Sequence, residues 1–383
     1  MFNIYGKYTD ATIYSDMCEP SALSLIYDLC NHPVFKDASI KIMPDVHSGA
    51  GCAVGTTIRM KGERVIPSIV GADIGCGVLT VIFEHDGEID FKSLDEYIDS
   101  SIPYGMAIRS TVHKGMSNEL KRKILSLCEE LGMYRSYQPF VRSCGTLGGG
   151  NHYIEIGLME NGKYALTIHT GSRGLGKCIA EYFGDVAKNY LHSNNITGVN
   201  RSLPYVEGDD YDSYVRAMLV AAEMARESRR LIAADILSFL GAKTIDSFDT
   251  MHNYIELHRD GSITIRKGAI RAADGERVAI PLNMRDGVLI CVGRGNPDWN
   301  CSAPHGAGRL MSRSEAKSSI SMEEYEVAMK GISSWSVVPS TIDESPMAYK
   351  PASMIREQIS DTVDILYTVR PVYNFKARSL SGR

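Results

Sequence analysis

The alternation of hydrophobic and polar positions along the chain predicts strands and helices in an interleaved order. Short apolar runs separated by glycine-rich turns predict strands, and apolar residues at three- and four-residue spacing predict helices. The predicted strands are Ser39–Met43, Cys52–Met60, Gly77–Glu84, Tyr153–Gly157, Tyr164–Ile168, His252–His258, Ser262–Lys267, Val288–Val292 and Thr368–Phe375. The predicted helices are Ser93–Ser101, Asn118–Leu131, Leu175–Leu191, Asp209–Leu240, Ser321–Lys330 and Met354–Tyr367.

Two local signals add detail to this pattern. Ser93 and Glu96 have the spacing of a capping box at a helix start. The turn Arg259-Asp260-Gly261 between two strand-like runs predicts a hairpin. No internal repeat and no low-complexity linker is visible. We therefore predict an α+β fold with mixed or antiparallel sheets flanked by helices, as one compact domain over residues 1–383 with a helical insertion over about 202–240.

Composition and charge exclude several classes of protein. Hydrophobic residues make up 44% of the chain and charged residues 23%, which excludes a disordered chain, collagen and a coiled-coil rod. The 41 Lys and Arg residues against 46 Asp and Glu residues give a formal net charge of −5. Because proteins that coat nucleic acid are normally basic, this charge alone argues against a nucleic-acid partner.

Cysteine usage and the absence of long apolar runs indicate the compartment. The nine cysteines form no CxxC pair, and their odd number fits a reducing environment better than a disulfide framework. The start of the sequence has no secretory signal pattern. No uncharged apolar run approaches the roughly 20 residues that span a bilayer. We therefore expect a soluble cytoplasmic protein.

Half of the histidines lie in segments rich in Gly, Asn, Asp or Ser, where polar side chains are available for chemistry. These are His47, His152, His169, His252 and His305. The others lie beside charged or helical residues, and we interpret them as satisfied polar or surface side chains. They are His32, His85, His113, His192 and His258.

The segment Val70–Val78 places Asp73 and Cys76 three residues apart among glycines. Glycine permits close backbone approach and positive φ. A thiolate and a carboxylate could thus converge on one cation. A tight turn with a buried free thiol explains the same segment equally well.

Three consecutive glycines, Gly148–Gly150, precede Asn151 and His152. A glycine-rich loop before a strand is typical of sites where backbone approaches a phosphate. On a regular strand His152 and Glu155 would point to opposite faces. If the strand begins after His152, the two residues could still have different roles at one site.

His169 ends a predicted strand and is followed by a glycine turn and a helix. A histidine at such a strand end is well placed as a metal ligand, and Arg173 with the helix N-terminus could hold an anion. An ordinary strand-to-helix turn accounts for the glycine spacing as well. His252 stands similarly at the start of the predicted hairpin.

The segment Pro304–Ser314 places His305 among small residues ahead of Arg309 and Arg313. If the segment is helical, the two arginines share one face. A neutral imidazole in an open loop beside arginines suits phosphate transfer, although a surface loop is the alternative. Together with Asp73 and Cys76, the histidines suit two metal ions that handle phosphates, and ligand softness alone favours zinc.

These segments, in this order, resemble the RtcB family of GTP-dependent RNA ligases. The resemblance runs from Met43 to near Lys376 and rests on four motifs together. They are Asp73-Ile74-Gly75-Cys76-Gly77, Gly150-Asn151-His152, His169-Thr170-Gly171-Ser172-Arg173-Gly174 and His305-Gly306-Ala307-Gly308-Arg309.

The resemblance implies a role for each matching residue. Asp73, Cys76 and His152 would bind one manganese ion, and Cys76, His169 and His252 the other, so manganese replaces the expectation of zinc. His305 would become guanylylated. Nucleotide contacts are implied for Asn151, His152, Glu155, His252, Asn253, Pro281, Asn283, Met284, Gly306, Ala307, Gly308, Tyr349 and Lys376. Positions near the RNA ends are implied for Asp45, Arg173, Arg309 and Arg313.

The implied reaction begins when His305 attacks the α-phosphate of GTP. The guanylyl group moves to an RNA 3′-phosphate, a 5′-hydroxyl attacks, and GMP leaves; a 2′,3′-cyclic phosphate is hydrolysed first. The implied roles are tRNA splicing or RNA repair. The compact chain resembles a bacterial branch linked to release-factor homologues and damaged ribosomal RNA. We expect a monomer, with a release-factor-type or activator protein as partner.

One segment departs from the family pattern. The chain reads Pro281-Leu282-Asn283-Met284-Arg285 where the family usually has Pro-Gly-Ser-Met-Gly, and Val288 stands where a hydroxyl residue is common. Asn283 would then replace a serine contact and Arg285 would add a charge. Specificity for guanine is less firmly implied than the metal site.

Two other functions fit part of the pattern. A dinuclear metallophosphoesterase would share the Cys, His and Asp ligands without needing His305. A non-catalytic RNA-binding relative would need neither the metal ligands nor His305, and the presence of every candidate ligand argues against this alternative.

The net negative charge of the chain is compatible with binding of RNA ends if Arg173, Arg309, Arg313 and Lys376 gather at one site with two metal cations.

Overall fold

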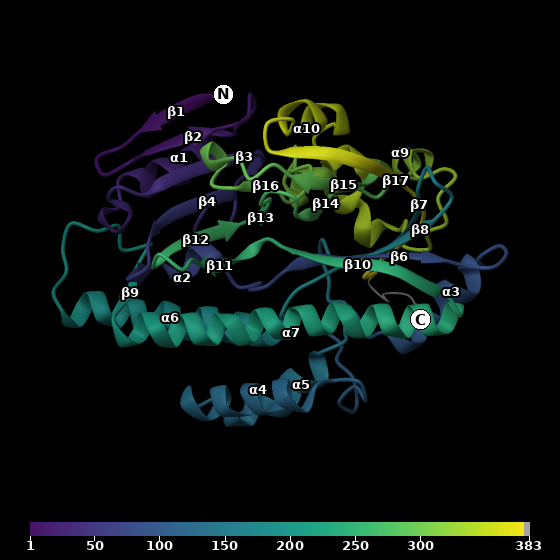
Figure 1. Cartoon of the computed structure of the whole chain (residues 1–383), viewed down its shortest axis with the longest axis horizontal. Helices are drawn as coiled ribbons and strands as arrows, with labels where there is room; N and C mark the ends of the chain where they lie inside the picture. Colours follow the sequence, from purple (N-terminus) through teal and green to yellow (C-terminus); the bar gives the residue numbers. More distant parts are fainter. Residues whose placement is uncertain (379–383) are drawn as a thin grey trace.

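The computed structural model describes residues 1–378, in which two sheets lie above a layer of long helices (Figure 1). The first sheet has six strands in the order β1-β2-β3-β4-β12-β11. Strands β2 and β3 are parallel and the other neighbours antiparallel. Its strands are β1 Phe2–Tyr5, β2 Asp10–Ile13, β3 Ser39–His47, β4 Val54–Lys61, β11 Asn253–Leu257 and β12 Ser262–Lys267.

The second sheet has seven antiparallel strands in the order β10-β6-β8-β7-β17-β15-β14. It curls until its two edge strands touch: the Ala279 amide donates to Thr250 Oγ1 at 3.2 Å, and Arg277 Nη2 donates to Asp246 Oδ1 at 3.0 Å. Its strands are β6 Gly77–Glu84, β7 Tyr153–Leu158, β8 Tyr164–Thr170, β10 Lys243–Met251, β14 Arg277–Asn283, β15 Gly287–Gly293 and β17 Val363–Lys376.

Helices α6 and α7 run side by side beneath the sheets, and α4 and α5 lie beyond them (Figure 1). The α-helices are α1 Pro20–Cys30, α2 Pro67–Val70, α3 Phe91–Ser101, α4 Asn118–Glu130, α5 Tyr137–Ser143, α6 Arg173–Ser193, α7 Asp209–Leu240, α8 Arg313–Ser319, α9 Met322–Ala328 and α10 Ala352–Gln358. Two short pairs, β5 Arg64–Val65 with β9 Val206–Glu207 and β13 Ala269–Arg271 with β16 Ser302–Pro304, complete the strands of the described residues.

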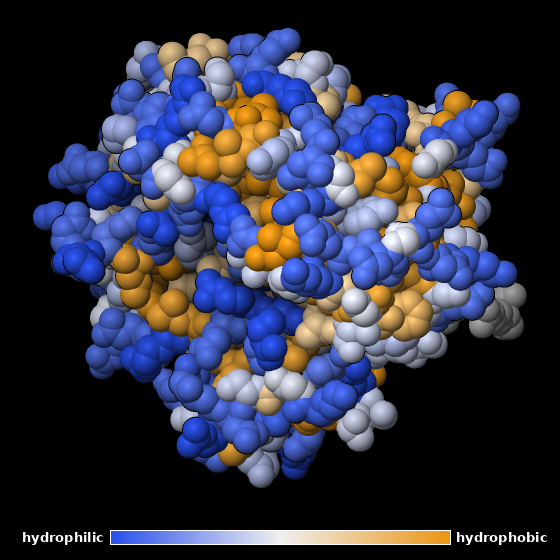
Figure 2. All heavy atoms as spheres, turned by 45° about the vertical axis from the view of Figure 1, so that its right-hand side comes forward, coloured by the Kyte–Doolittle hydropathy of each residue, from blue (hydrophilic) through white to orange (hydrophobic). Residues whose placement is uncertain are grey.

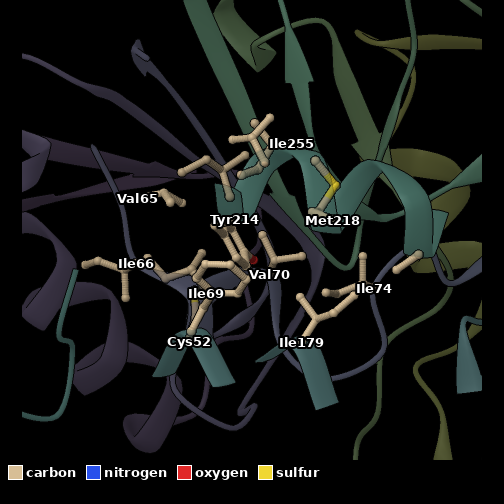
Figure 3. Packing of buried hydrophobic residues seen from close by; sticks show 14 of the residues in the cluster. Cys52, Val65, Ile66, Ile69, Val70, Ile74, Ile179, Tyr214, Met218 and Ile255 are labelled. Atoms are coloured by element: carbon tan, nitrogen blue, oxygen red, sulfur yellow. The ribbon is translucent and has the colours of Figure 1, made fainter. Parts of the chain in front are cut away.

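A hydrophobic cluster anchors the loop that carries Asp73 and Cys76. Ile69, just before this loop, and Ile74, between Asp73 and Cys76 within it, are fully buried. They pack in one cluster with Ile179 of α6 and Tyr214 and Met218 of α7 (Figure 3). Burial of each large aliphatic side chain contributes about 1.5–3 kcal/mol, so the loop is anchored to the core at its start and at Ile74.

Most predicted elements are confirmed, and Gly77–Glu84, Asp209–Leu240 and Ser262–Lys267 match to the residue. The capping box at Ser93 is wrong: Asp90 caps α3, and its carboxylate accepts from the Lys92 and Ser93 amides. A real capping box joins Ser321 and Glu324 at the start of α9. The prediction missed α1, α2, α5, α8, β1, β2, β5, β9, β13, β14 and β16.

The predicted helix Met354–Tyr367 is also wrong beyond its first turns. Helix α10 ends at Gln358, and β17 begins at Val363. Val363, Ile365, Thr368 and Val369 are β-branched and favour the extended chain, which pairs with β15.

The α+β fold with mixed and antiparallel sheets is confirmed. The division into one domain over 1–383 with an insertion at about 202–240 stays a prediction. Within the described residues, no helix combines the length and apolarity needed to cross a membrane. The face in Figure 2 is covered mainly by hydrophilic side chains, with separate hydrophobic patches between them.

Candidate metal and nucleotide site

The strand order of the second sheet brings four predicted metal ligands together. Cys76 precedes β6, His152 precedes β7, His169 lies in β8 and His252 follows β10. Cys76 Sγ lies 3.1 Å from His169 Nε2 and 3.5 Å from His152 Nε2. The Nε2 atoms of His169 and His252 are 3.4 Å apart. With Asp73, whose Oδ2 is 3.0 Å from His152 Nε2, these residues form what we call the metal cluster.

Backbone carbonyls orient two imidazoles of the metal cluster. His152 Nδ1 lies 3.0 Å from the Leu147 carbonyl, and His169 Nδ1 lies 3.2 Å from the Asn151 carbonyl. A carbonyl can only accept, so each Nδ1 carries the proton and each Nε2 presents a lone pair.

Burial lowers the pKa values of His169 and His252 well below the usual value, which keeps both rings neutral. The metal cluster therefore presents sulfur, nitrogen and carboxylate lone pairs to one another. Such a donor set is unfavourable alone and suits a cation, so the residues fit the implied metal site. One glycine is also required here, because a Cβ on Gly171 would lie 1.9 Å from Asp73 Oδ1.

A buried arginine, which the sequence analysis did not single out, links the backbone segments that carry two of the metal ligands. Arg229 of α7 is fully buried and forms two hydrogen bonds to the Asp249 carboxylate at 2.6 and 2.8 Å. Its Nη1 donates to the carbonyls of Gly75 at 2.9 Å and Thr170 at 2.7 Å. Arg229 thus joins the backbone beside Cys76 to the backbone beside His169.

A cavity of about 420 Å³ lies next to the metal cluster, and we call it the nucleotide cavity. Of the predicted nucleotide and RNA residues, those lining it are Asn151, Glu155, Pro281, Asn283, Met284, His305, Gly306, Ala307, Gly308, Arg309, Arg313, Tyr349 and Lys376. His169 lines it too, which makes the cluster and the cavity continuous. The residues that line it do not include five of the predicted ones: His152, His252, Asn253, Asp45 and Arg173.

Two predicted residues hold protein groups in this structure. The Asn253 amide donates to the Asp73 carbonyl at 3.2 Å and accepts from the Gly268 amide at 2.9 Å, so Asn253 supports the metal loop. Arg173 donates to the Gly105 carbonyl at 2.6 Å and to Thr146 Oγ1 at 3.1 Å.

His305 is held by the buried carboxylate of Asp45. Asp45 Oδ2 lies 2.6 Å from His305 Nδ1 and 3.1 Å from the His305 amide nitrogen. This pairing directs Nε2 away from the carboxylate. The His305 and His252 rings lie 4.7 Å apart, so the candidate nucleophile is adjacent to the metal cluster.

Glu155 is a buried carboxyl group in the wall of the cavity. Asn374 Nδ2 donates to its Oε2 at 2.9 Å, while its Oε1 has no hydrogen-bond partner among the described residues. Burial raises the pKa of Glu155 to about 8, against the opposing effects of Asn374 and Lys376. An unpaired buried oxygen in a cavity wall suits a ligand that donates hydrogen bonds.

Glu344, which the sequence prediction missed, joins the charged side chains of the cavity. Its Oε2 accepts from Lys376 Nζ and from Tyr349 Oη, each at 2.8 Å, and its Oε1 pairs with Arg313. Burial alone would raise its pKa, but the charges of Lys376 and Arg313 lower the pKa of Glu344 to about 2. Arg309 Nη1 also lies 3.5 Å from Glu344 Oε1.

Arg309 and Arg313 therefore meet at a shared carboxylate and not on a common helix face. Helix α8 begins at Arg313, so Arg309 lies outside it. The two arginines do not share one helix, yet both line the cavity, and their predicted position near the RNA ends stays a prediction.

The altered segment Pro281–Arg285 runs from the last three residues of β14 into the turn before β15. Asn283 Nδ2 donates to Asp286 Oδ2 at 2.8 Å, and Asn283 Oδ1 accepts from the amides of Arg285 and Asp286. Arg285 Nε donates to Asp286 Oδ1 at 2.9 Å. The side chains of Asn283 and Arg285, which depart from the family pattern, therefore find their hydrogen-bond partners within this segment. Val288 lies nearby in the cavity wall.

The family model described as tRNA-splicing ligase RtcB matches residues 26–377, nearly the whole chain. The chain belongs to the RtcB family. The RNA-splicing ligase RtcB of Escherichia coli K12 is 34% identical over 363 residues, which cover 87% of this chain and 88% of that protein. The tRNA-splicing ligase RtcB of Aeropyrum pernix is 28% identical, covering 85% and 84%. The RNA-splicing ligase RtcB of Mycobacterium tuberculosis is 29% identical, covering 82% and 91%.

Membership of the RtcB family confirms the resemblance drawn from the four motifs. The motif residues converge on the metal cluster and the nucleotide cavity. Relatives from bacteria and archaea are named as RNA ligases, which favours ligation over the metallophosphoesterase alternative.

Proposed function

We propose that this protein is an RNA ligase that joins RNA 3′-phosphate or 2′,3′-cyclic phosphate ends to 5′-hydroxyl ends, using GTP and manganese. The observation that carries the proposal is the position of His305. It is oriented by Asp45, opens into a cavity large enough for a nucleotide and lies against the metal cluster.

The chemistry assigned to His305 follows from its hydrogen bond to Asp45. With Nδ1 bound to the carboxylate, Nε2 attacks the α-phosphorus of GTP, the bond to the β-phosphate oxygen breaks, and pyrophosphate leaves. An oxygen of the RNA 3′-phosphate then attacks the guanylyl phosphorus and frees His305. The RNA 5′-hydroxyl attacks the activated phosphate, loses its proton, and releases GMP.

The metal cluster supports these reaction steps because it would hold positively charged metal ions. Asp73, Cys76 and His152 would bind one manganese ion and Cys76, His169 and His252 the second. Bound cations would neutralise the triphosphate and the RNA phosphates. Asp45 orients His305 in this proposal instead of contacting an RNA end, and the other predicted nucleotide and RNA-end residues keep the roles that the family resemblance implies.

The proposal is tested by sealing defined RNA ends with GTP and manganese, beside a labelled-GTP adduct assay. We expect an acid-labile protein–GMP bond in the natural protein and none in His305→Ala. His192→Ala, in the last turn of α6, is the matched control and should form the adduct normally. An adduct that survives in His305→Ala would refute the assignment, and a phosphoesterase would form none in any variant.

The RNA itself is addressed by sequencing RNA crosslinked to the His305→Ala protein. Transfer RNA halves would indicate tRNA splicing, and cleaved ribosomal RNA would indicate repair. A release-factor-type or activator partner would be recovered in the same complexes.

A further inference from the structure

The segment that carries Asp45 is held by side-chain donors at three successive carbonyls. Lys350 Nζ donates to the carbonyl of Pro44 at 2.8 Å and to that of Val46 at 3.0 Å. Between them, His47 Nδ1 lies 2.9 Å from the Asp45 carbonyl. The backbone on both sides of Asp45 is thus fastened by one ammonium group.

The same lysine is joined to the loop that carries His305. The backbone amide of Lys350 donates to the Gly308 carbonyl at 3.0 Å. Gly308 has φ of +75°, and a Cβ there would lie 2.3 Å from the Asp45 carbonyl oxygen. Lys350 therefore connects the loop of the nucleophile to the strand of its carboxylate at a point of close backbone contact.

The surroundings of Lys350 suit a charged amine. Its side chain is buried, and a third carbonyl, that of Met17, lies 3.4 Å from Nζ, so the three N–H bonds of an ammonium each have an acceptor. Burial lowers the pKa of Lys350, and the negative charge of Asp45 opposes this shift. Asp45 is fully buried, and its Oδ1 has no hydrogen-bond partner among the described residues. A nearby cation compensates such a carboxylate.

We propose that Lys350 is a positioning residue for guanylylation, which fixes the Asp45 carboxylate and thereby the orientation of His305. This role rests on the proposed function, in which His305 attacks GTP. Lys350 touches neither nucleotide nor RNA in this assignment, because its three donors are taken by carbonyls.

The test compares Lys350→Met with Lys41→Met in the full-length protein. Lys41 is on strand β3, as Asp45 is, but its Nζ donates to Thr12 Oγ1 of β2 at 3.2 Å instead of to the carbonyls beside Asp45. Single-turnover guanylylation should slow by about 10- to 100-fold in Lys350→Met, because a displacement of about 1 Å at the reacting group can cost about 100-fold. The GTP concentration at half-saturation should change little, and Lys41→Met should react at the natural rate.

A second readout does not depend on activity. Proton NMR of protein labelled with ¹⁵N-histidine should show a downfield His305 Nδ1–H signal, which is identified by its loss in His305→Asn. The signal should shift or vanish in folded Lys350→Met, whereas a lysine that only adds stability would leave it in place.

A double-mutant cycle with Asp45→Asn asks whether Lys350 acts through Asp45. We expect Lys350→Met to add little to the loss caused by Asp45→Asn. A full additional loss, or a natural rate with an unchanged signal, would overturn the proposal. If Lys350→Met does not fold, the same measurements on Lys350→Arg decide, because the larger guanidinium must displace the held carbonyls.

Failure of the proposed function would be distinguishable. If the natural protein forms no GMP adduct, the ligase assignment fails, but the NMR signal still shows whether Lys350 fixes the pair of Asp45 and His305.

Discussion

The metal cluster and the nucleotide cavity are neighbouring halves of one site, but they satisfy their polar groups in opposite ways. In the metal cluster, lone pairs on Cys76, His152 and His169 face one another within 4.8 Å. In the nucleotide cavity, the cations of Arg313 and Lys376 are already paired with Glu344. The first half is thus prepared for a cation, whereas an anionic ligand in the second half must compete with an internal carboxylate.

The largest effect is expected from a substitution that disrupts the metal cluster and leaves the nucleotide cavity intact. Cys76→Ala removes the donor shared by both proposed ions, so manganese affinity should fall at least about 100-fold and metal-dependent adduct formation should disappear. Isothermal titration with manganese and the labelled-GTP assay measure the two losses. His305→Ala should show the reverse pattern, with metal binding kept and the adduct lost.

Cys128→Ala is the control for this change, because Cys128 is a buried thiol of α4 outside the metal cluster. Full activity of Cys76→Ala, after chelation and return of manganese, would contradict the bridging role of the thiolate.

A smaller effect is expected when the internal carboxylate of the cavity is neutralised. Glu344→Gln keeps the shape but leaves Lys376 without its buried counter-charge, while Arg313 keeps its ion pair with Asp343, so the free energy of unfolding should fall by about 3 kcal/mol at neutral pH. Urea denaturation measures this. An unchanged unfolding free energy would show that the carboxylate does not stabilise the cavity.

The stabilisation by Glu344 should also depend on pH. The pKa of Glu344 is lowered to about 2 in the folded protein from an ordinary 4.5. Its stabilisation is therefore fully present above about pH 4.5 and is lost as the pH falls towards 2. Glu344→Gln should lose less stability than the natural protein over this range.

The difference between the two halves also explains what the sequence could and could not predict. The metal ligands stand in glycine-rich segments at strand ends, and strand order then brings such residues together. Glu344 and Lys350 carry no such signal, because a charged residue near a proline resembles a surface side chain. Their partners lie more than 30 and 300 residues away, at Lys376 and Pro44, so only the folded chain reveals them.

The same limit applies to local structure. The periodicity that predicted α7 to the residue arises from a long amphipathic helix, a strong signal. The chain changes from helix α10 to strand β17 over a few residues. Pairing with β15, which is distant in sequence, determines that the second part is extended.

Nucleotide affinity should depend on pH through Glu155. Its pKa of about 8 keeps the unliganded carboxyl neutral at pH 7, whereas guanine would donate hydrogen bonds to the ionised form. Binding then releases a proton, so GTP affinity should rise by up to about tenfold per pH unit below pH 8 and level off above it.

Glu155→Gln is the matched variant, since its amide does not titrate in this range. Titration of GTP at pH 6, 7, 8 and 9 should give a steep dependence for the natural protein and a shallow one for Glu155→Gln. Equal slopes would assign the dependence to another group.

The smallest effect is expected at the segment that departs from the family pattern. Asn283→Ser restores a serine, but the Asn283 amide is held by Asp286 and by two backbone amides in the turn. A net hydrogen bond of about 1 kcal/mol corresponds to about fivefold, so the ratio of kcat/KM for GTP over ATP in adduct formation should change by no more than this. A change of about 100-fold would instead mean that Asn283 leaves the turn to contact the base. The cavity would then rearrange when it binds a nucleotide.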